Sequence, residues 1–371
     1  MLFAFCLVAT SSMAQALSKV QAEKERDKVV AEWKQEMYQQ TDYITAKQAI
    51  VRADKTMPVN WQVFGQKPSD GYALFISLHG GGNTATQVND SQWRNQWLLY
   101  APQGAVYVCP RAPYDDWDMH FKPGLDEFYH DIINYAVTHL NVNPDKVYVM
   151  GYSAGGDGVW RLAPRMADTW AAASMMAGHP GDVSLDNLRN TPFMVWCGAL
   201  DAAYDRNKRC AERIAELDSL QQAVPGGYIH EGHIVAGKPH WMDRVDTLAV
   251  SWMAQYKRNP YPHDIIWRQE EVLHPDFYWV SVAKEEMKRG MQLRLSVKKN
   301  TIRIEQCDYR QLCLGLSDEL LDLDKPVTIY VGKKRIYNNK VKRSSEVMKK
   351  WIHRKGDASY ACSAEITITL P

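Results

Sequence analysis

Hydrophobic positions between residues 60 and 256 fall into short continuous apolar runs separated by longer amphipathic stretches. Four runs of the continuous kind cover residues 72–78, 105–110, 147–150 and 193–197. Runs of this length are typical of strands that are buried on both faces. Between them, residues 127–140 and 209–220 carry apolar side chains at helical spacing. Strands that alternate with helices predict an α/β fold with a mostly parallel, doubly wound sheet.

Two further segments precede this alternation. Residues 17–50 are rich in charge, yet several apolar side chains recur on one helical side. We therefore expect one or two helices laid over the outside of the main domain. Residues 59–64 alternate between apolar and polar positions, which predicts a strand at the edge of the sheet.

The pattern changes after Asn259-Pro260 to short alternating runs separated by turns, which is typical of a compact β-rich module. A surface helix is expected near residues 344–354 and a closing strand near 364–370. A chain of 371 residues exceeds what one core usually serves. The predicted domains are residues 17–258 and residues 259–371. The second is either a packing partner that caps the first or a glycan-binding module with exposed Trp267, Tyr278 or Trp279.

The first residues have features of an export signal. An apolar run too short to span a bilayer is followed by small residues suited to signal-peptidase cleavage, so residues 1–16 are predicted to be a signal peptide. The chain is then expected to be secreted or periplasmic, with no membrane span after cleavage. Export permits disulfides. Six further cysteines follow Cys6, and their pairing cannot be deduced from the sequence.

The charge balance narrows the class of partner. The formal net charge is +1, so electrostatics give no support for binding nucleic acid or an anionic membrane. Thirteen Trp and nineteen Tyr are compatible with large cores, or with aromatic platforms for sugars and aryl groups.

The buried run at residues 147–150 leads directly into Gly151-Tyr152-Ser153-Ala154-Gly155, which has the spacing G-x-S-x-G. The turn at Ser153 must be so tight that side chains at positions 151 and 155 would collide, so both are glycine. Such a turn exposes the serine hydroxyl at the start of a helix, where free N–H groups favour developing negative charge. Ser153 is therefore predicted to be a catalytic nucleophile.

A second motif, His79-Gly80-Gly81-Gly82, follows the buried run at residues 72–78. Consecutive glycines allow the backbone to turn so that amides point into a cavity. In serine hydrolases with such a run, one of these amides forms the oxyanion hole together with the amide that follows the nucleophile. The predicted donors are Ala154 and either Gly81 or Gly82.

Two more residues complete a candidate triad. Asp201 stands directly after the run at 193–197, where a carboxylate would orient a histidine; Asp205 is the competing acid. His240 lies in a loop before a helical pattern at residues 245–256, with His230 and His233 as competitors.

With these four motifs, residues 61–256 resemble an α/β-hydrolase. They are most similar to the secreted bacterial esterase branch that includes feruloyl-esterase-like and polyhydroxybutyrate-depolymerase-like proteins, some of which have a trailing β-module. Prolyl-oligopeptidase-like hydrolases are near neighbours. The order Ser153, Asp201, His240 is the order of this fold. The resemblance implies catalysis through an acyl-enzyme without a metal or organic cofactor.

The substrate is predicted less directly. Export and an aromatic loop at residues 111–122 suggest a small-molecule or polysaccharide ester, with Arg111, Trp117 and Tyr152 as candidate substrate-binding residues. Arg111 follows a strand and is either a partner for a uronate carboxylate or a solvated loop arginine. Two alternatives stay open, namely an exopeptidase of prolyl-oligopeptidase type and a non-catalytic glycan-binding protein. His230, Glu231 and His233 lack the further ligand that a zinc site would need.

Overall fold

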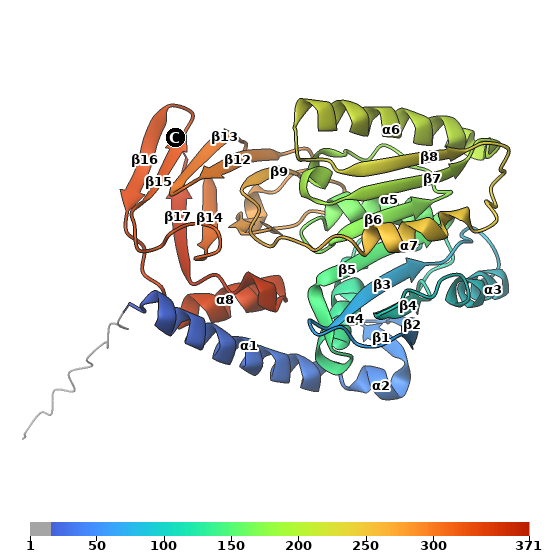
Figure 1. Cartoon of the computed structure of the whole chain (residues 1–371), viewed down its shortest axis with the longest axis horizontal. Coiled ribbons are helices and arrows are strands. Elements are labelled where there is room, and N and C mark those ends of the chain that lie inside the picture. Colours follow the sequence, from blue (N-terminus) through green and yellow to red (C-terminus); the bar gives the residue numbers. More distant parts are fainter. Residues whose placement is uncertain (1–15, 371) are drawn as a thin grey trace, which may run out of the picture.

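The computed structural model describes residues 16–370, and Figure 1 shows the eight-stranded sheet beside a smaller β-rich part. The order of strands in the large sheet is β1-β2-β4-β3-β5-β6-β7-β8. Strands β3 to β8 pair in parallel, while β1 and β2 pair antiparallel to their neighbours. The strands are β1 (Ala49–Arg52), β2 (Lys55–Phe64), β3 (Tyr72–Leu78), β4 (Ala105–Pro110), β5 (Val142–Tyr152), β6 (Ala172–Met176), β7 (Phe193–Gly198) and β8 (His230–Val235). This α/β-hydrolase topology confirms the predicted fold class.

Helices cover both faces of the large sheet, because its strands alternate apolar side chains between two cores. On β3, Leu74 and Ile76 join the core under α4, α5 and α6, while Phe75 joins the core under α3 and α7. The helices are α3 (Thr86–Trp97), α4 (Asp126–His139), α5 (Ala154–Arg165), α6 (Arg206–Ala223) and α7 (Leu248–Met253). Short 3₁₀ segments are η1 (Asp186–Asn190), η2 (Ala203–Asp205), η3 (Val245–Thr247), η4 (Lys284–Glu286) and η5 (Ala358–Tyr360).

The prediction of an edge strand at residues 59–64 is confirmed. These residues form the second half of β2 and, among the described strands, pair only with β4, whereas β1 pairs with residues 55–58. The antiparallel hairpin at residues 49–58 adds β1 beside the first half of β2. The alternating pattern has a physical cause, since only one face of β2 is well covered.

The C-terminal part consists of two small sheets packed around a single apolar core. Their orders are β10-β11-β14-β17 and β16-β15-β13-β12-β9, and every pair is antiparallel except β13 with β15. The strands are β9 (Asp264–Arg268), β10 (Asp276–Phe277), β11 (Val280–Ser281), β12 (Gln292–Lys298), β13 (Thr301–Cys307), β14 (Gln311–Leu316), β15 (Val327–Val331), β16 (Lys334–Asn339) and β17 (Ala364–Thr369). Helix α8 (Ser345–Lys355) is close to the predicted surface helix.

The aromatic residues expected to form a glycan platform lie inside this core. Trp267, Tyr278 and Trp279 are all at most 2% exposed. Tyr278 has φ +51 and turns the chain between β10 and β11, so the run at 277–280 is a hairpin rather than one strand. Burial of all three rings contradicts their use as an exposed sugar-binding surface.

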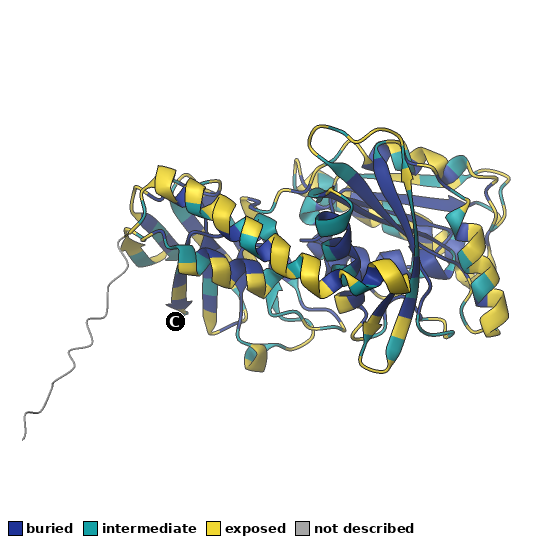
Figure 2. Ribbon diagram, turned by 90° about the horizontal axis from the view of Figure 1, so that it is seen from below, coloured by how far each residue is buried: buried dark blue, intermediate teal, exposed yellow. Residues whose placement is uncertain are grey.

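The N-terminal helices were expected to cover only the main domain, but the first of them also contacts the C-terminal part. Helix α1 (Lys19–Thr41) precedes α2 (Tyr43–Lys47) and packs along both α4 and α8. Figure 2 shows it crossing from the large sheet to the C-terminal part, with one exposed and one buried side. It therefore does not simply cover the main domain. Residues 1–15 of the predicted signal peptide lie outside the described residues.

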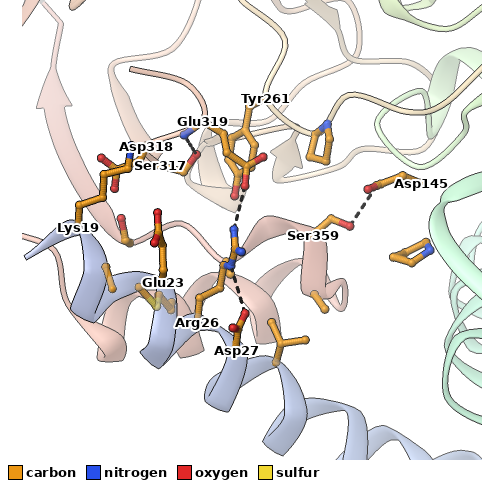
Figure 3. Close-up of a pocket in the computed structure, with 18 of the residues that line it drawn as sticks. Lys19, Glu23, Arg26, Asp27, Asp145, Tyr261, Ser317, Asp318, Glu319 and Ser359 are labelled. Atoms are coloured by element: carbon orange, nitrogen blue, oxygen red, sulfur yellow. Dashed lines mark hydrogen bonds and ion pairs between the residues drawn. The ribbon is translucent and has the colours of Figure 1, made fainter. Parts of the chain in front are cut away.

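Polar groups line the space between α1 and the C-terminal part. Figure 3 shows Arg26 of α1 reaching toward Glu319, with Nη1 to Oε1 at 3.1 Å. This pair borders a cavity of about 450 Å³ that is bordered on the side of the large sheet by Asp145. Both side chains of the pair are largely exposed, so its contribution to stability is at most about 1 kcal/mol.

A buried arginine joins the two parts more firmly. The guanidinium of Arg258 lies 2.7 Å from Asp145 at the start of β5 and 2.6 Å from Asp357 in the C-terminal part. It also donates to the carbonyl oxygen of Asp168. The Asp168 carboxylate in turn pairs with Lys355 and accepts the N–H of Tyr278. The C-terminal part is thus joined to the large α/β part by ionic as well as apolar contacts.

The structure also bears on the expectations about membrane-spanning helices and about disulfides. No helix within residues 16–370 combines the length and apolar character needed to cross a membrane. In the same part of the chain all six cysteines are unpaired: Cys109, Cys197, Cys210, Cys307, Cys313 and Cys362.

Candidate active site

The turn after β5 holds Ser153 in a strained conformation. Its φ is +58 and ψ is −121, a combination that costs a non-glycine residue about 1–3 kcal/mol. A Cβ at Gly151 would lie 2.4 Å from the carbonyl oxygen of Gly155, and one at Gly155 would lie 2.1 Å from that of Leu78. Glycine is therefore required at both positions. The hydroxyl consequently stands at the first turn of α5.

A hydrogen-bonded chain links three side chains from distant parts of the sequence. Oγ of Ser153 lies 3.0 Å from Nε2 of His240, and Nδ1 of His240 lies 2.7 Å from Oδ2 of Asp201. Ser153 follows β5, Asp201 follows β7 and His240 follows β8. Because the carboxyl ends of parallel strands meet at one edge of the sheet, the topology brings the three residues together.

Asp201 is surrounded by groups that favour its charged form. Burial alone would raise the pKa of this carboxyl, but the hydrogen bond and charge of His240 and the nearby Arg206 outweigh burial and lower it. Nη1 of Arg206 lies 3.0 Å from Oδ1 of Asp201 and 3.4 Å from Nδ1 of His240. The carboxylate is therefore available to orient the imidazole and to stabilise its cation.

The competing candidates lie elsewhere. Asp205 pairs with Lys208 on the surface of α6. His230 contacts Asp218, and the ring of His233 stacks on Trp196. Within the described range, no group of three or more His, Cys, Asp or Glu side chains is arranged to hold a metal ion.

One amide in the glycine run after β3 already donates a hydrogen bond within the protein. The N–H of Gly82 donates to Oδ1 of Asn89 at 2.9 Å. A Cβ at Gly81 would lie 2.1 Å from the same oxygen, and the φ of Gly81 is +115. The N–H of Gly81 has no acceptor among residues 16–370. Of the two predicted donors from this run, Gly81 is the one whose amide is free.

Two buried histidines hold this glycine run in place through hydrogen bonds to the backbone. Nε2 of His79 accepts the N–H of Ala112, so the proton sits on Nδ1, which donates to the carbonyl oxygen of Gly80. Nε2 of His120 contacts the carbonyl oxygen of His79 at 2.8 Å. Burial lowers the pKa of His120 to about 4 and that of His79 well below its usual value. Both rings are thus neutral at pH 7.

Arg111 does not face a substrate site. The residue is buried, and its guanidinium contacts Asp90 at 2.8 Å and Asp115 at 2.5 Å. Asp115 also accepts from the Asn89 carboxamide at 2.7 Å. The expectation of a substrate-binding or solvated arginine is corrected, because helix α3 packs against the loop and covers the side chain. Arg111 therefore acts on Asn89 through Asp115, and Asn89 in turn accepts the N–H of Gly82.

Tyr152 and Trp117 have different surroundings. The Tyr152 hydroxyl donates to the carbonyl oxygen of His240 at 2.6 Å and accepts the N–H of Met242, so it fixes the histidine loop. Its ring also borders the space beside Ser153. Trp117 is 53% exposed and borders a second pocket beside Ser153, which Tyr152 does not line.

Two clefts meet at Ser153. The larger one, here called the Leu98 cleft, has a volume of about 780 Å³ and is bordered by Ser153 and His240. Its walls include Thr84, Val88, Leu98, Leu99, Trp241 and Arg244. The second, here called the Trp117 cleft, has a volume of about 370 Å³. Its walls include Trp117, Phe121, Asp157, Arg161, Tyr204 and Arg206.

Several site residues were missed by sequence reasoning. Arg206 is the clearest case, since it lies five residues after Asp201 and three residues before the predicted helix at 209–220. Arg161 and Asp157 follow Ser153 on α5 at helical spacing, which places them on a face that the nucleophile shares. Asn89 carried no recognisable signal.

Comparisons with known proteins add little to this geometry. Neither a scan of protein-family models nor a search of curated proteins finds a match. Among solved structures, a thermostable esterase matches with TM-score 0.44 and 18% identity, covering 57% of this chain and 62% of that one. A ferulic acid esterase matches with TM-score 0.40 and 15% identity, covering 56% and 95%. A feruloyl esterase module from Clostridium thermocellum, complexed with sinapinate, matches with TM-score 0.38 and 15% identity, covering 54% and 83%.

Proposed function

We propose that this chain is a serine ester hydrolase that uses Ser153, His240 and Asp201. The observation that carries the proposal is the continuous hydrogen-bonded chain from Oγ of Ser153 through His240 to the buried Asp201. The strained turn at Ser153 supports it, because strain of this kind exposes a nucleophile at the end of a strand.

In the proposed reaction, His240 Nε2 takes the proton of Ser153 as Oγ attacks the ester carbonyl. The negative charge that develops on the carbonyl oxygen is stabilised by the N–H groups of Gly81 and Ala154, each worth about 3 kcal/mol. His240 then gives its proton to the departing alcohol, and the acyl group stays on Ser153. Water, deprotonated by His240, releases the acid and restores the serine.

We further propose that the substrate is an ester carried by a polysaccharide. An exported chain, as predicted from residues 1–16, would meet such esters outside the cytoplasm. The exposed aromatic ring of Trp117 beside Ser153 suits a sugar or aryl group, since such rings stack on flat substrates.

A parallel substrate panel tests this function. Purified protein and the Ser153→Ala variant would be given p-nitrophenyl acetate, methyl ferulate, methyl-esterified pectin, acetylated xylan and a Gly-Pro-nitroanilide. We expect hydrolysis of at least one ester, with loss of at least about 10³-fold in the variant because no other nucleophile stands at this turn. Circular dichroism of both proteins checks that the fold is unchanged.

The other results have definite meanings. Turnover of the anilide alone would assign the protein to the peptidases. Ester turnover that survives in Ser153→Ala would remove Ser153 from the mechanism.

A further inference from the structure

The Trp117 cleft contains a cluster of polar side chains, of which Asp157 and Arg161 take no part in the triad chemistry. Asp157 and Arg161 lie on α5, and Arg206 lies at the start of α6. One oxygen of Asp157 accepts the N–H of His179 at 2.6 Å, which leaves its other oxygen for a further partner. Nε of Arg206 is buried and has no hydrogen-bond partner in the described chain.

The charges in this cluster are already balanced. Arg206 pairs with Asp201, and Nη1 of Arg161 lies 2.9 Å from Asp182. Burial raises the pKa of Asp157 to about 6, against the N–H of His179 and the charges of Arg206, His240 and Arg161, which lower it. With two paired cations and one further carboxyl, the cleft has no excess positive charge for an anionic ligand. It offers both donors and acceptors to a neutral ligand instead.

Aromatic rings form the outer walls of the cleft. Trp117 packs edge-on against Phe121 with ring centroids 5.3 Å apart, and it remains 53% exposed. Tyr204 is 81% exposed and lies beside the Arg206 guanidinium. Flat apolar walls above a polar floor suit a ring that has an apolar face and hydroxyl groups at its edge.

The position of His240 decides which half of an ester enters this cleft. His240 must reach the oxygen of the departing alcohol in order to protonate it. It borders the Leu98 cleft and not the Trp117 cleft. The alcohol therefore leaves through the Leu98 cleft, whose apolar walls include Leu98 and Trp241, and the acyl group occupies the Trp117 cleft.

The number of polar groups distinguishes between ring types. Besides Ser153 and Trp117, six side chains with polar groups border the cleft, namely Asn83, Asp157, Arg161, His179, Tyr204 and Arg206. A phenolic ring with one hydroxyl would bury most of them without partners, which is costly. A sugar ring offers several hydroxyls that both donate and accept.

We propose that the Trp117 cleft binds a sugar acid as the acyl group, so that the enzyme cleaves the ester of a uronic acid. This inference rests on the proposed serine ester hydrolase function. Asp157 and Arg161 bind ring hydroxyls, Trp117 and Tyr204 contact the ring, and the bond broken joins the uronosyl carbonyl carbon to the alcohol oxygen. Ser153 Oγ replaces that oxygen, the alcohol takes the proton from His240, and water later releases the free uronate.

The test compares methyl esters that differ only in the acyl group. Methyl galacturonate and methyl glucuronate are matched with methyl cyclohexanecarboxylate, which has a six-membered ring without hydroxyls, and with methyl ferulate. We expect kcat/KM of one uronate to exceed that of both other esters by tenfold or more. The ratio of uronate to cyclohexanecarboxylate should fall at least tenfold in Asp157→Asn and in Arg161→Gln, since each removes a charge-assisted hydrogen bond.

Matched control variants distinguish a loss of substrate binding from a general loss of folding or activity. Arg209→Gln and Asp218→Asn make the same chemical changes at side chains that are 56% and 69% exposed on α6. They should leave the ratio at the wild-type value. Asn at position 157 can still accept the N–H of His179, so this variant is expected to fold.

Failure of the inference is distinguishable from failure of the proposed function. Ser153-dependent hydrolysis of p-nitrophenyl acetate, combined with a uronate ratio near one or a ratio unchanged in the two variants, overturns the uronate assignment alone. Preference for methyl ferulate likewise overturns it in favour of an aryl acyl group. Absence of Ser153-dependent hydrolysis of every ester overturns both.

Discussion

At the scale of single residues, Asp201 serves two partners at once. His240 and Arg206 contact different oxygens of the same buried carboxylate, at 2.7 Å and 3.0 Å. The Arg206 guanidinium keeps the carboxylate charged, and it also lies 3.4 Å from Nδ1 of His240. A guanidinium cannot accept a hydrogen bond, so Asp201 is the acceptor for a proton on Nδ1. The carboxylate therefore favours the tautomer that leaves Nε2 free for Ser153.

Replacement of this acid is the sharpest test at this scale. Asp201→Asn presents an amide to Nδ1, which favours the wrong tautomer, and we expect kcat for the best ester to fall by about 10⁴-fold. Asp205→Asn is the matched control, because Asp205 contacts only Lys208 on the surface. Both kcat and the thermal midpoint should be measured. A large loss in Asp205→Asn, with Asp201→Asn active, would show that the wrong acid has been assigned.

Residue-level predictions were most successful where the constraint is local. The glycines at 151 and 155 follow from the steric needs of one turn, and contacts with their immediate neighbours explain both. Arg111 could not be predicted in this way. Its burial depends on Asp90 from α3 and Asp115 from the following loop, and nothing in the residues next to Arg111 indicates that these acids converge on it.

At the scale of elements, the loop after β3 depends on neutral histidines. His79 accepts the N–H of Ala112 and donates to Gly80, so protonation of its Nε2 would remove one of two bonds that hold the run. His120 contacts the His79 carbonyl oxygen, and its Nδ1 is buried without a partner in the described chain. The conformation that frees the Gly81 amide is therefore sensitive to acid.

A pH titration of stability tests this dependence. The pKa of His120 is about 4 when folded and about 6.5 when unfolded, so the unfolded chain binds more protons between these values. Stability from a neutral His120 is present above about pH 6.5 and lost as the pH falls toward 4. Asp157 and Glu270, with pKa values raised to about 6 and about 7, act in the opposite direction.

The variant His120→Gln isolates the contribution of this one group. Gln keeps an amide donor for the His79 carbonyl oxygen but does not titrate. The free energy of unfolding, measured in urea, should be most similar between wild type and variant at pH 7, where His120 is neutral and Gln makes the same hydrogen bond. The difference should shift in favour of the variant by about 3 kcal/mol at pH 4, since one pKa unit corresponds to about 1.4 kcal/mol. A constant difference across this range would mean that His120 is not held neutral by burial.

The elements themselves were predictable to different degrees. Buried strands and the helices after them have clear periodicities, and the doubly wound sheet follows from their alternation. Residues 277–280 are four consecutive apolar residues, a pattern that suggests one strand, but they bury around a turn at Tyr278. A run that short is apolar in either conformation, so only the packing of the second sheet decides between them.

At the scale of the whole molecule, the C-terminal part is joined to the large α/β part through one buried cation. Arg258 stands at the end of the large α/β part and contacts Asp145 on that side and Asp357 on the other. Its side chain is 3% exposed, whereas the Arg26–Glu319 pair that also spans the two parts is open to solvent. Removing one partner of a buried ion pair destabilises a protein strongly, whereas removing one partner of an exposed pair has little effect.

Arg258→Met therefore tests whether the two parts fold as one unit. The variant leaves Asp357, whose side chain is 18% exposed, without its cation, and we expect about 3 kcal/mol less stability in urea, with a single unfolding transition. Arg209→Met, which removes an exposed pair with Glu212, should cost less than about 0.5 kcal/mol. Adding Asp357→Asn to Arg258→Met should restore part of the loss, because the unpaired charge is removed. If Arg258→Met instead shows two transitions, with ester hydrolysis lost only in the second, the C-terminal part is an independent domain and the capping role is wrong.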